Sequence, residues 1–292
     1  MNQPVIKLGV PKGSLEDATL GLFERAGWKI RKHDRSYFPD INDPEIAISL
    51  CRAQEMGRYV HDGIMDVGLT GRDWVLETEA DVHVVSDLVY SKVSSRPARW
   101  VLAVAGDSPY QKPEDLAGRH IATELQGVTR RFFEERGIQV KVSYSWGATE
   151  AKVVEGLADA IVEVTETGTT IRAHGLRILC DVMITNTVLI ANKIAWQDPA
   201  KRRKIEQIDL LLQGALRAAS LVCLKMNVPT ARLDAVLALL PALTSPTVAP
   251  LRDAGWVSVE TVVSTNLVRD LIPSLRAAGA EGIIELALNK VV

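Results

Sequence analysis

A stretch near the middle of the chain carries the residue types that would bind a phosphorylated sugar. Residues 159–170 run from an apolar segment to Glu163, through a hydroxyl-rich loop that contains Gly168, and into a helical pattern. Such a loop presents backbone N–H groups and hydroxyls at the positive end of a helix, which suits a phosphate group. Glu163 would stand beside the phosphate and accept hydrogen bonds from ribose hydroxyls. The stretch suits a 5-phosphorylated ribose, but an ordinary threonine-rich strand-to-helix turn has the same pattern and is common.

Two cations follow predicted strands in the first part of the chain. Lys12 lies in the turn after the first strand, and Arg52 follows the next one. Ligands of open α/β folds bind at this edge of a sheet, where a fixed cation suits diphosphate or triphosphate oxygens. A solvated lysine and an exposed ion pair are the alternative readings. The turn over residues 66–73 has glycines that would let a flat ring or a phosphate approach the backbone.

The elements that would position these residues alternate between strands and helices. Strands are predicted over 5–10, 45–50 and 66–70, with helices from Ser14 onward and over 54–62. This alternation favours a mostly parallel sheet with helices on both faces. A second set follows, with strands over 99–105, 119–123, 139–143, 159–164 and 189–192, and helices over 113–118, 127–136, 149–156 and 198–219.

The last part of the chain has a different order of elements. Strands over 221–226, 247–251, 256–263 and 282–288 and helices over 232–240 and 267–278 give the order βαββαβ. This order is the ferredoxin-like arrangement. We therefore predict a separate C-terminal domain with a boundary near residue 215.

Composition excludes several classes of protein. Lys and Arg total 34 against 36 Asp and Glu, so no basic excess exists for a nucleic-acid backbone. The three cysteines are far apart and are expected to be free thiols in a reducing compartment. The apolar stretch over 208–224 is interrupted by polar residues, and no targeting segment is recognised, so we expect a soluble cytoplasmic protein. The sequence has no P-loop, no dinucleotide-binding fingerprint and no zinc-protease motif.

The motifs together closely resemble ATP phosphoribosyltransferases of the long form, which catalyse the first step of histidine biosynthesis. The matching segments follow one another in the family's order over nearly the whole chain: residues 8–15, 66–73, 115–118, 121–123, 157–171, 189–193 and 245–250. Several motifs in order are far more specific than any one of them.

The resemblance implies an α/β fold with two catalytic lobes of the periplasmic-binding-protein type, between which the chain crosses twice. Lobe I would comprise residues 1–91 and 183–215. Lobe II would comprise residues 92–182 and carry the phosphoribosyl-binding loop. Residues 216–292 would form an ACT-like, ferredoxin-like regulatory domain that binds histidine.

The resemblance also implies the reaction. N1 of the adenine of ATP would attack C1 of phosphoribosyl pyrophosphate, and diphosphate would leave. Since neutral adenine is a modest nucleophile, the anomeric carbon would gain oxocarbenium character, and holding both substrates in line can contribute ~7–11 kcal/mol. Mg²⁺ on the diphosphate would act as a Lewis acid and keep waters and substrate oxygens, so no direct protein ligands are expected.

Roles in the site follow by match to the family. The catalytic residues would be Lys12 and Glu163. The substrate-binding residues would be one arginine, one glycine-containing turn and the threonine-rich loop: Arg52, Gly68, Leu69, Thr70, Gly71, Thr165, Glu166, Thr167, Gly168, Thr169 and Thr170. No general base is assigned. Many relatives carry an arginine where Ser14 stands, so a phosphate-binding charge would come from elsewhere, such as Arg72 or Arg96.

For regulation, the resemblance implies a histidine pocket with five residues: Asn227, Leu243, Ser245, Thr247 and Gly282. The implied partners are ATP, phosphoribosyl pyrophosphate and histidine as inhibitor, in a dimer or hexamer of this chain, without nucleic acid or membrane. Two alternatives are a two-lobed sensor without catalysis and a catalytic chain that needs a separate regulatory partner. Glu163 beside the loop argues against the first, and the C-terminal domain argues against the second.

Overall fold

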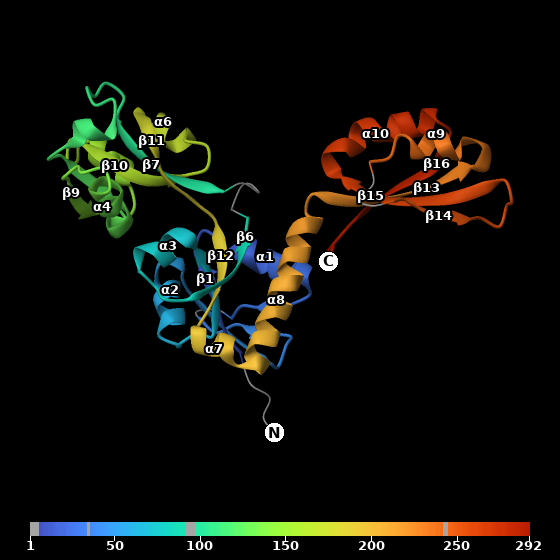
Figure 1. The fold of residues 1–292 in the computed structure, drawn as a ribbon, viewed down its shortest axis with the longest axis horizontal. Coiled ribbons are helices and arrows are strands. Elements are labelled where there is room, and N and C mark those ends of the chain that lie inside the picture. Colours follow the sequence, from blue (N-terminus) through green and yellow to red (C-terminus); the bar gives the residue numbers. More distant parts are fainter. Residues whose placement is uncertain (1–5, 34–35, 91–96, 242–244) are drawn as a thin grey trace. The chain divides into compact units, whose positions relative to one another are not determined.

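The computed structural model describes residues 6–33, 36–90, 97–241 and 245–292 (Figure 1). Arg96 and Leu243 of the predicted sites therefore lie outside the described residues. The chain divides into two compact units, Met1–Glu24 with Trp28–Asp209 and Arg25–Gly27 with Leu210–Val292. The border near 210 falls inside one helix, α8 (Pro199–Ala218), a few residues before the boundary predicted from the sequence. None of the helices in the described part of the chain is long and apolar enough to cross a membrane.

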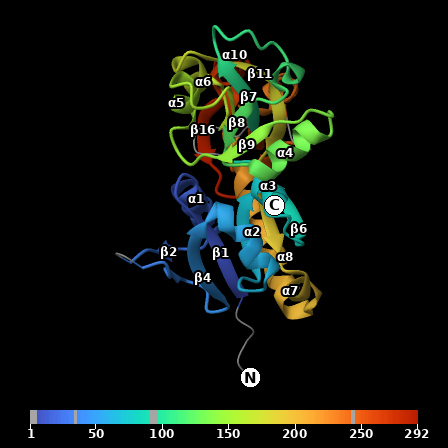
Figure 2. The same cartoon turned by 90° about the vertical axis from the view of Figure 1, so that its left-hand side faces the viewer.

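The first unit holds two five-stranded sheets, and each is the centre of one lobe. The sheet of lobe I has the order β4-β1-β5-β12-β6, from β1 (Ile6–Lys12), β4 (Ile46–Arg52), β5 (Val67–Gly71), β6 (His83–Leu88) and β12 (Thr187–Ala191). A two-stranded hairpin of β2 (Ile30–Arg31) and β3 (Asp40–Ile41) lies before β4. In Figure 2, β4 lies at the outer edge of this sheet beside β1.

Helices cover both faces of the lobe I sheet. In Figure 1, α2 (Ala53–His61) and α3 (Arg72–Glu77) lie on one side, and α1 (Glu16–Ala26) and the first half of α8 lie on the other. Met56 of α2 is fully buried against the sheet. A Cβ atom would lie 2.4 Å from the Met56 sulfur at Gly9 and 2.6 Å from it at Gly68. The two glycines therefore form a slot for this side chain, and the packing of α2 requires them.

Lobe II is built on the second sheet, with the order β11-β7-β10-β8-β9. Its strands are β7 (Ala98–Ala105), β8 (His120–Thr123), β9 (Lys141–Tyr144), β10 (Ala160–Thr165) and β11 (Leu176–Thr185). Alternate residues of β7 enter two separate apolar clusters, Trp100 and Leu102 on one face and Val101 and Ala103 on the other. The helices around this sheet are η1 (Pro113–Leu116), α4 (Gln126–Glu134), α5 (Thr149–Val154) and α6 (Thr169–Ala173).

The prediction of mostly parallel sheets is wrong, whereas two lobes with two crossings are confirmed. In lobe I, β1 pairs in parallel with β4 and β5, but β12 pairs antiparallel with β5 and β6. In lobe II, β8 is parallel to β9 and β10, but β7 is antiparallel to β10 and β11. Each sheet mixes directions because the chain leaves lobe I after β6 and returns between β11 and β12.

Four strands and one α-helix of the described residues were not predicted from the sequence: β2, β3, β6, β11 and α7 (Lys193–Gln197). β6 has several exposed residues, so its apolar pattern is weak. β11 has two register shifts against β7, which break the alternation on which strand prediction depends. The short helix α3 follows the Gly71 turn directly, and the segment expected as a helix after residue 113 is 3₁₀.

A buried polar contact joins the lobes. The carboxylate of Asp73, at the start of α3, accepts a hydrogen bond of 2.6 Å from Trp100 Nε1 in β7. Its backbone N–H donates to the Thr185 hydroxyl at the end of β11, and burial raises the pKa of the Asp73 carboxyl.

The other end of α3 also contacts lobe II. Glu77 accepts from the N–H groups of Gly127 and Val128 at the start of α4. Helix α3 therefore belongs to lobe I by chain order and is bonded to lobe II at both ends.

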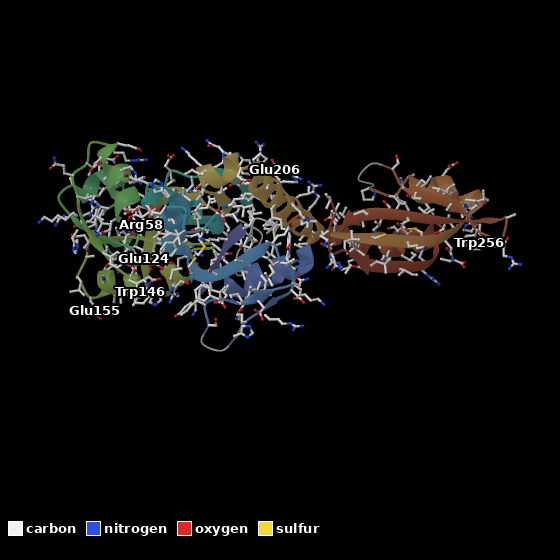
Figure 3. All side chains as sticks on the ribbon, turned by 90° about the horizontal axis from the view of Figure 1, so that it is seen from below. Arg58, Glu124, Trp146, Glu155, Glu206 and Trp256 are labelled. Atoms are coloured by element: carbon white, nitrogen blue, oxygen red, sulfur yellow. The ribbon has the colours of Figure 1, made fainter. Side chains whose placement is uncertain are left out.

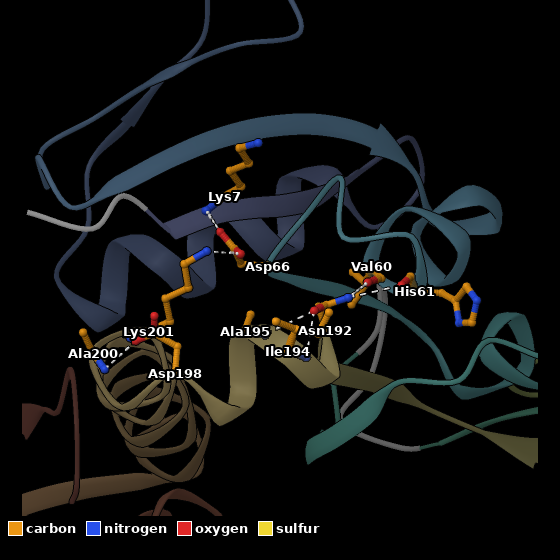
Figure 4. Close-up of polar contacts among 10 residues, drawn as sticks. All are labelled: Lys7, Val60, His61, Asp66, Asn192, Ile194, Ala195, Asp198, Ala200 and Lys201. Atoms are coloured by element: carbon orange, nitrogen blue, oxygen red, sulfur yellow. Dashed lines mark hydrogen bonds and ion pairs between the residues drawn. The ribbon is translucent and has the colours of Figure 1, made fainter.

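The returning strand β12 and the helices after it are fixed to lobe I by two polar side chains (Figure 4). Asp66 accepts from the Lys7 N–H at 2.9 Å and from Lys201 Nζ at 2.6 Å. Asn192 donates to the carbonyl of Val60 at 2.9 Å, and its side-chain oxygen caps α7 (Lys193–Gln197). These contacts bring segments more than 100 residues apart in the chain onto one sheet.

The C-terminal unit confirms the predicted βαββαβ order. It contains β13 (Leu221–Pro229), η2 (Thr230–Arg232), α9 (Leu233–Leu237), β14 (Thr247–Pro250), β15 (Trp256–Ser264), α10 (Thr265–Ala277) and β16 (Glu281–Ala287). The strand order is β14-β15-β13-β16 with antiparallel pairing throughout, which is the ferredoxin-like topology. Alternate β13 residues, Val222, Leu224, Met226 and Val228, pack with residues of α9 and α10 in one apolar core.

The slot for Met56 gives a stability prediction. Gly68→Ala should lower the free energy of unfolding by about 1–3 kcal/mol, because the added methyl overpacks a buried site. Urea denaturation of the wild type, Gly68→Ala, Met56→Ala and the double variant would measure the coupling. We expect Gly68→Ala to lower the free energy of unfolding much less when Met56 is already alanine. If the effects of the two substitutions simply add, Gly68 does not form a slot for the Met56 side chain.

Candidate active site

The threonine-rich loop lies between β10 and α6, at the carboxyl end of the lobe II sheet. The N–H of Gly168 donates to Thr165 Oγ1 at 2.7 Å, and the N–H of Thr169 donates to Thr167 Oγ1 at 3.4 Å. Gly168 has φ +74°, in the left-handed region that favours glycine, so the loop turns back on itself before α6 begins. The loop thus gathers N–H groups and hydroxyls over six residues.

Arg172 lies behind this loop. Its guanidinium donates to the Thr167 carbonyl at 2.9 Å, and one of its nitrogens would lie 2.8 Å from a Cβ added at Gly168. The side chain therefore holds the loop and adds a positive charge close to its N–H groups. An arginine four residues after the loop glycine is the sequence signal by which it could have been found.

Glu163 stands in β10, two residues before the loop. Its carboxylate accepts from the Val164 N–H at 3.0 Å and from the Thr149 hydroxyl. Burial is the main cause that raises the pKa of Glu163 to about 7; the charges of Glu150 and Glu124 act in the same direction, and these hydrogen bonds oppose them. The carboxyl therefore changes its protonation state near neutral pH and can accept hydrogen bonds from ligand hydroxyls when ionised.

Glu124 is a second acidic residue of the site, and sequence reasoning missed it. It follows β8, the strand next to β10, and Figure 3 labels it in lobe II. Its carboxylate accepts hydrogen bonds from the Gln54 side chain and the Gly147 backbone, and burial raises its pKa. Because Gln54 belongs to α2 of lobe I, this contact joins the edges of the two lobes. An acidic residue at the end of a predicted strand was its only sequence signal.

Lys12 and Arg52 are neighbours in the structure. They form the last residue pair of the parallel strands β1 and β4, at the carboxyl edge of the lobe I sheet. The Lys12 ammonium lies 4.0 Å from the centre of the Tyr37 ring, and the Arg52 guanidinium lies near Gly13. Arg52 also precedes the N-terminus of α2. Two cations and a helix N-terminus at one edge suit a polyphosphate.

The turn over residues 68–71 has a packing explanation for each of its residues. Gly68 faces Met56, and a Cβ at Gly71 would lie 1.9 Å from the Asp73 carboxylate. Leu69 and Thr70 are fully buried, and the Thr70 hydroxyl donates to the Ala53 carbonyl at 2.6 Å. Only backbone atoms of this turn are therefore candidates for contact with a ligand.

Arg72 and Arg96 are the two candidates to replace the arginine that many relatives carry at position 14. Arg72 donates to Asp87 at 2.7 Å and is engaged in that ion pair, whereas Arg96 lies outside the described residues. Among the residues that the structure describes, no three His, Cys, Asp or Glu side chains group together as a metal site. All three cysteines are free.

The predicted histidine pocket is divided within one chain. Asn227 of β13 and Gly282 of β16 lie together, since a Cβ at Gly282 would be 3.9 Å from the Asn227 amide nitrogen. Ser245 and Thr247 are exposed and lie at β14, on the other side of β15. Two strand spacings of about 4.8 Å therefore separate Thr247 from β13.

Comparisons with known proteins agree along the whole chain. Residues 52–214 match the ATP phosphoribosyltransferase family, and residues 218–290 match the C-terminal domain of the same family. The chain is 75% identical over 287 residues to an ATP phosphoribosyltransferase of Nitratidesulfovibrio vulgaris, which covers 98% of both proteins. It is 69% identical over 288 residues to that of Solidesulfovibrio magneticus, covering 99% of this chain and 98% of the other.

The structure has a solved relative as well. It is similar to the ATP phosphoribosyl transferase (HisG:HisZ) complex from Thermotoga maritima, with a TM-score of 0.61 and 27% identity. That match covers 72% of this chain and 97% of the other. The relatives thus agree with the two-lobed catalytic part and with the C-terminal domain, and a sensor without catalysis is not favoured. The chain belongs to the ATP phosphoribosyltransferase family in its long form and is a transferase of histidine biosynthesis.

Proposed function

We propose that the two lobes divide the substrates between them. Glu163 and the loop over residues 165–170 would hold phosphoribosyl pyrophosphate, and Lys12 and Arg52 would hold the triphosphate of ATP or the departing diphosphate. The contact between Gln54 and Glu124 carries this proposal. Gln54 follows Arg52 by two residues, and Glu124 acts electrostatically on Glu163, so the cationic edge and the threonine-rich loop meet at one place.

The loop suits the 5-phosphate for a specific reason. Its N–H groups already donate to oxygen atoms, the hydroxyls of Thr165 and Thr167. Phosphate oxygens would take the place of these acceptors, and the hydroxyls would rotate and donate to the phosphate instead. The charge of Arg172 behind the loop would favour a dianion. Thr167, Gly168, Thr169 and Thr170 would supply the main contacts.

We propose Mg²⁺ as the metal. Glu124 and Glu163 offer hard oxygen atoms of the kind that this ion prefers, but two carboxylates make no dedicated cage. The ion would therefore arrive on the diphosphate and keep waters and substrate oxygens. When bound, the ion would neutralise the negative charge that develops on the leaving diphosphate.

The contribution of the chain is then position and electrostatics. Glu163 would fix the ribose through its hydroxyls, and the loop would fix the other end of the sugar. Lys12 and Arg52 would align the polyphosphate. Proximity of this kind can lower the activation barrier by ~7–11 kcal/mol. The buried carboxylates near the ribose would favour the positive charge of an oxocarbenium-like transition state.

The phosphate loop is tested by steady-state formation of phosphoribosyl-ATP from ATP, phosphoribosyl pyrophosphate and Mg²⁺. In Thr169→Ala with Thr170→Ala, KM for phosphoribosyl pyrophosphate should rise on the order of 100-fold or more, because two hydrogen bonds to a charged group are lost. KM for ATP should change little. Thr265→Ala, at an exposed threonine of α10, is the matched control. An unchanged KM for the sugar would refute the assignment.

The raised pKa of Glu163 predicts that kcat/KM for phosphoribosyl pyrophosphate depends on pH. The ionised carboxylate accepts hydrogen bonds from ribose hydroxyls, and below its pKa of about 7 the protonated form loses acceptor capacity. The kcat/KM for phosphoribosyl pyrophosphate should therefore rise with pH through about 7 and level off above it. Glu163→Gln should lower the plateau and remove the part of the rise that the substrate's own ionisation does not explain. A profile identical in shape for both proteins would contradict this role.

Regulation by histidine is proposed for the C-terminal unit. Asn227 and Gly282 would form one side of the pocket, and Ser245 and Thr247 another. Since β15 separates Asn227 from Thr247, a single ligand would reach both only if the second set came from another copy of the chain. This division supports a homo-oligomer, such as a dimer or hexamer. For an enzyme that consumes ATP in biosynthesis we propose the cytoplasm.

Asn227→Ala tests the pocket in the intact enzyme. Its uninhibited kcat and KM should match the wild type, while the histidine concentration for half-inhibition should rise on the order of 10-fold, since a hydrogen-bond partner of the ammonium is lost. Ser258→Ala, at the residue that pairs with Asn227 from β15, is the control. Equal inhibition of all three proteins would remove Asn227 from the pocket.

A further inference from the structure

An exposed aromatic pair lies at the carboxyl edge of the lobe II sheet. Trp146 is 70% exposed and Tyr144, the last residue of β9, is 60% exposed. Parallel pairing of β9 with β8 and of β8 with β10 brings the ends of these three strands to the same edge. That edge carries Glu124 and Glu163.

The loop that carries Trp146 is attached to both acidic residues. Gly147, the next residue, donates its N–H to Glu124, and Thr149 donates its hydroxyl to Glu163. Ser145 and Thr149 are buried, and the Ser145 hydroxyl donates to Thr149 Oγ1 at 3.1 Å. Figure 3 labels Trp146 and Glu124 in the same part of lobe II. The backbone that carries Trp146 is therefore held by the groups that would hold the ribose.

The backbone of this loop is also strained. Gly147 has φ +69° and Ala148 has φ +48°, and the left-handed conformation costs a residue with a Cβ about 1–2 kcal/mol. Such strain persists only where the surrounding contacts impose it, and it is common at ligand sites. Here those contacts are the bonds to Glu124, Glu163 and Ser145.

A flat apolar surface next to the ribose is what the second substrate needs. The purine must lie beside the anomeric carbon, on the face opposite the leaving diphosphate, and every base has a π-face that an indole can stack on. The carboxylate of Glu124, bonded to the residue after Trp146, is an acceptor of the kind that an exocyclic amine requires. Single exposed apolar residues are common on protein surfaces. Trp146 differs from them because its loop is bonded to two acidic residues of the site.

We propose that Trp146 is the stacking surface for the purine of the nucleotide substrate. This inference rests on the proposed division of the substrates between the lobes and adds the base to it. The triphosphate would lie on the Lys12 and Arg52 side, and the base would reach across to lobe II.

The experiment compares Trp146→Ala, Trp146→Phe and Leu157→Ala, all as full-length enzyme. Leu157 is 65% exposed and precedes β10, at the opposite edge of the same sheet, so it is the matched control. In Trp146→Ala, KM for ATP should rise about 5- to 150-fold, the range measured for loss of one stacked base. KM for phosphoribosyl pyrophosphate should stay within about two-fold. Trp146→Phe should keep most of the ATP affinity, and Leu157→Ala should behave as wild type.

Inhibition by inorganic tripolyphosphate separates the base from the phosphates. Its inhibition constant against ATP should be the same in the wild type and in Trp146→Ala, because the indole does not contact phosphate in this proposal. Provided that the wild type forms product, two results would overturn the inference. One is an unchanged KM for ATP in Trp146→Ala, and the other is an equal loss of affinity for ATP and for tripolyphosphate. Absence of product from the wild type would instead refute the proposed function itself.

Discussion

The catalytic part of the molecule is organised around three acidic side chains: Asp73, which is buried, and Glu124 and Glu163, which are partly buried. Each has a pKa raised by burial, and the charges of Asp73 and Glu124 act in turn on the next residue in the series. A buried carboxylate needs hydrogen-bond donors. Those donors include Trp74 and Trp100 at Asp73, Gln54 and Gly147 at Glu124, and Thr149 at Glu163. Trp100 and Gln54 each donate across from the other lobe, so the acidic residues take part in the contact between the lobes.

This arrangement suits a reaction whose transition state carries positive charge on a sugar carbon. A region of negative potential that exists before the substrate arrives does not need to reorganise during the reaction. The cations Lys12 and Arg52 lie at the edge of the other lobe, where negative polyphosphate would be bound. In the proposed division of the substrates, lobe I would offer positive charge to a polyphosphate and lobe II negative charge to the ribose.

The sequence predicted most of the strands that carry the site, because Glu163, Lys12 and Arg52 follow strongly apolar segments. It also predicted the C-terminal order of elements in full. Strand direction was not predictable, because β12 returns from lobe II and only long-range pairing fixes its orientation. Glu124 was missed for the same reason, since its partner Gln54 is distant in sequence. Trp146 was missed because its loop reaches Glu163 only through Thr149. The glycines at 68 and 71 were noticed, but Met56 and Asp73, which fill the space beside them, could be identified only in three dimensions.

The slot that Gly9 and Gly68 form around Met56 also links protein chemistry to folding. Oxidation of a thioether adds a polar oxygen and a new stereocentre to the side chain. The sulfur is fully buried beside two glycine backbones and already accepts from the Cys51 thiol at 3.5 Å, so that oxygen would have no room. The sulfoxide can therefore form only when α2 has separated from the sheet, and it would then hinder return. Peroxide sensitivity at this single position would report how often the first lobe opens.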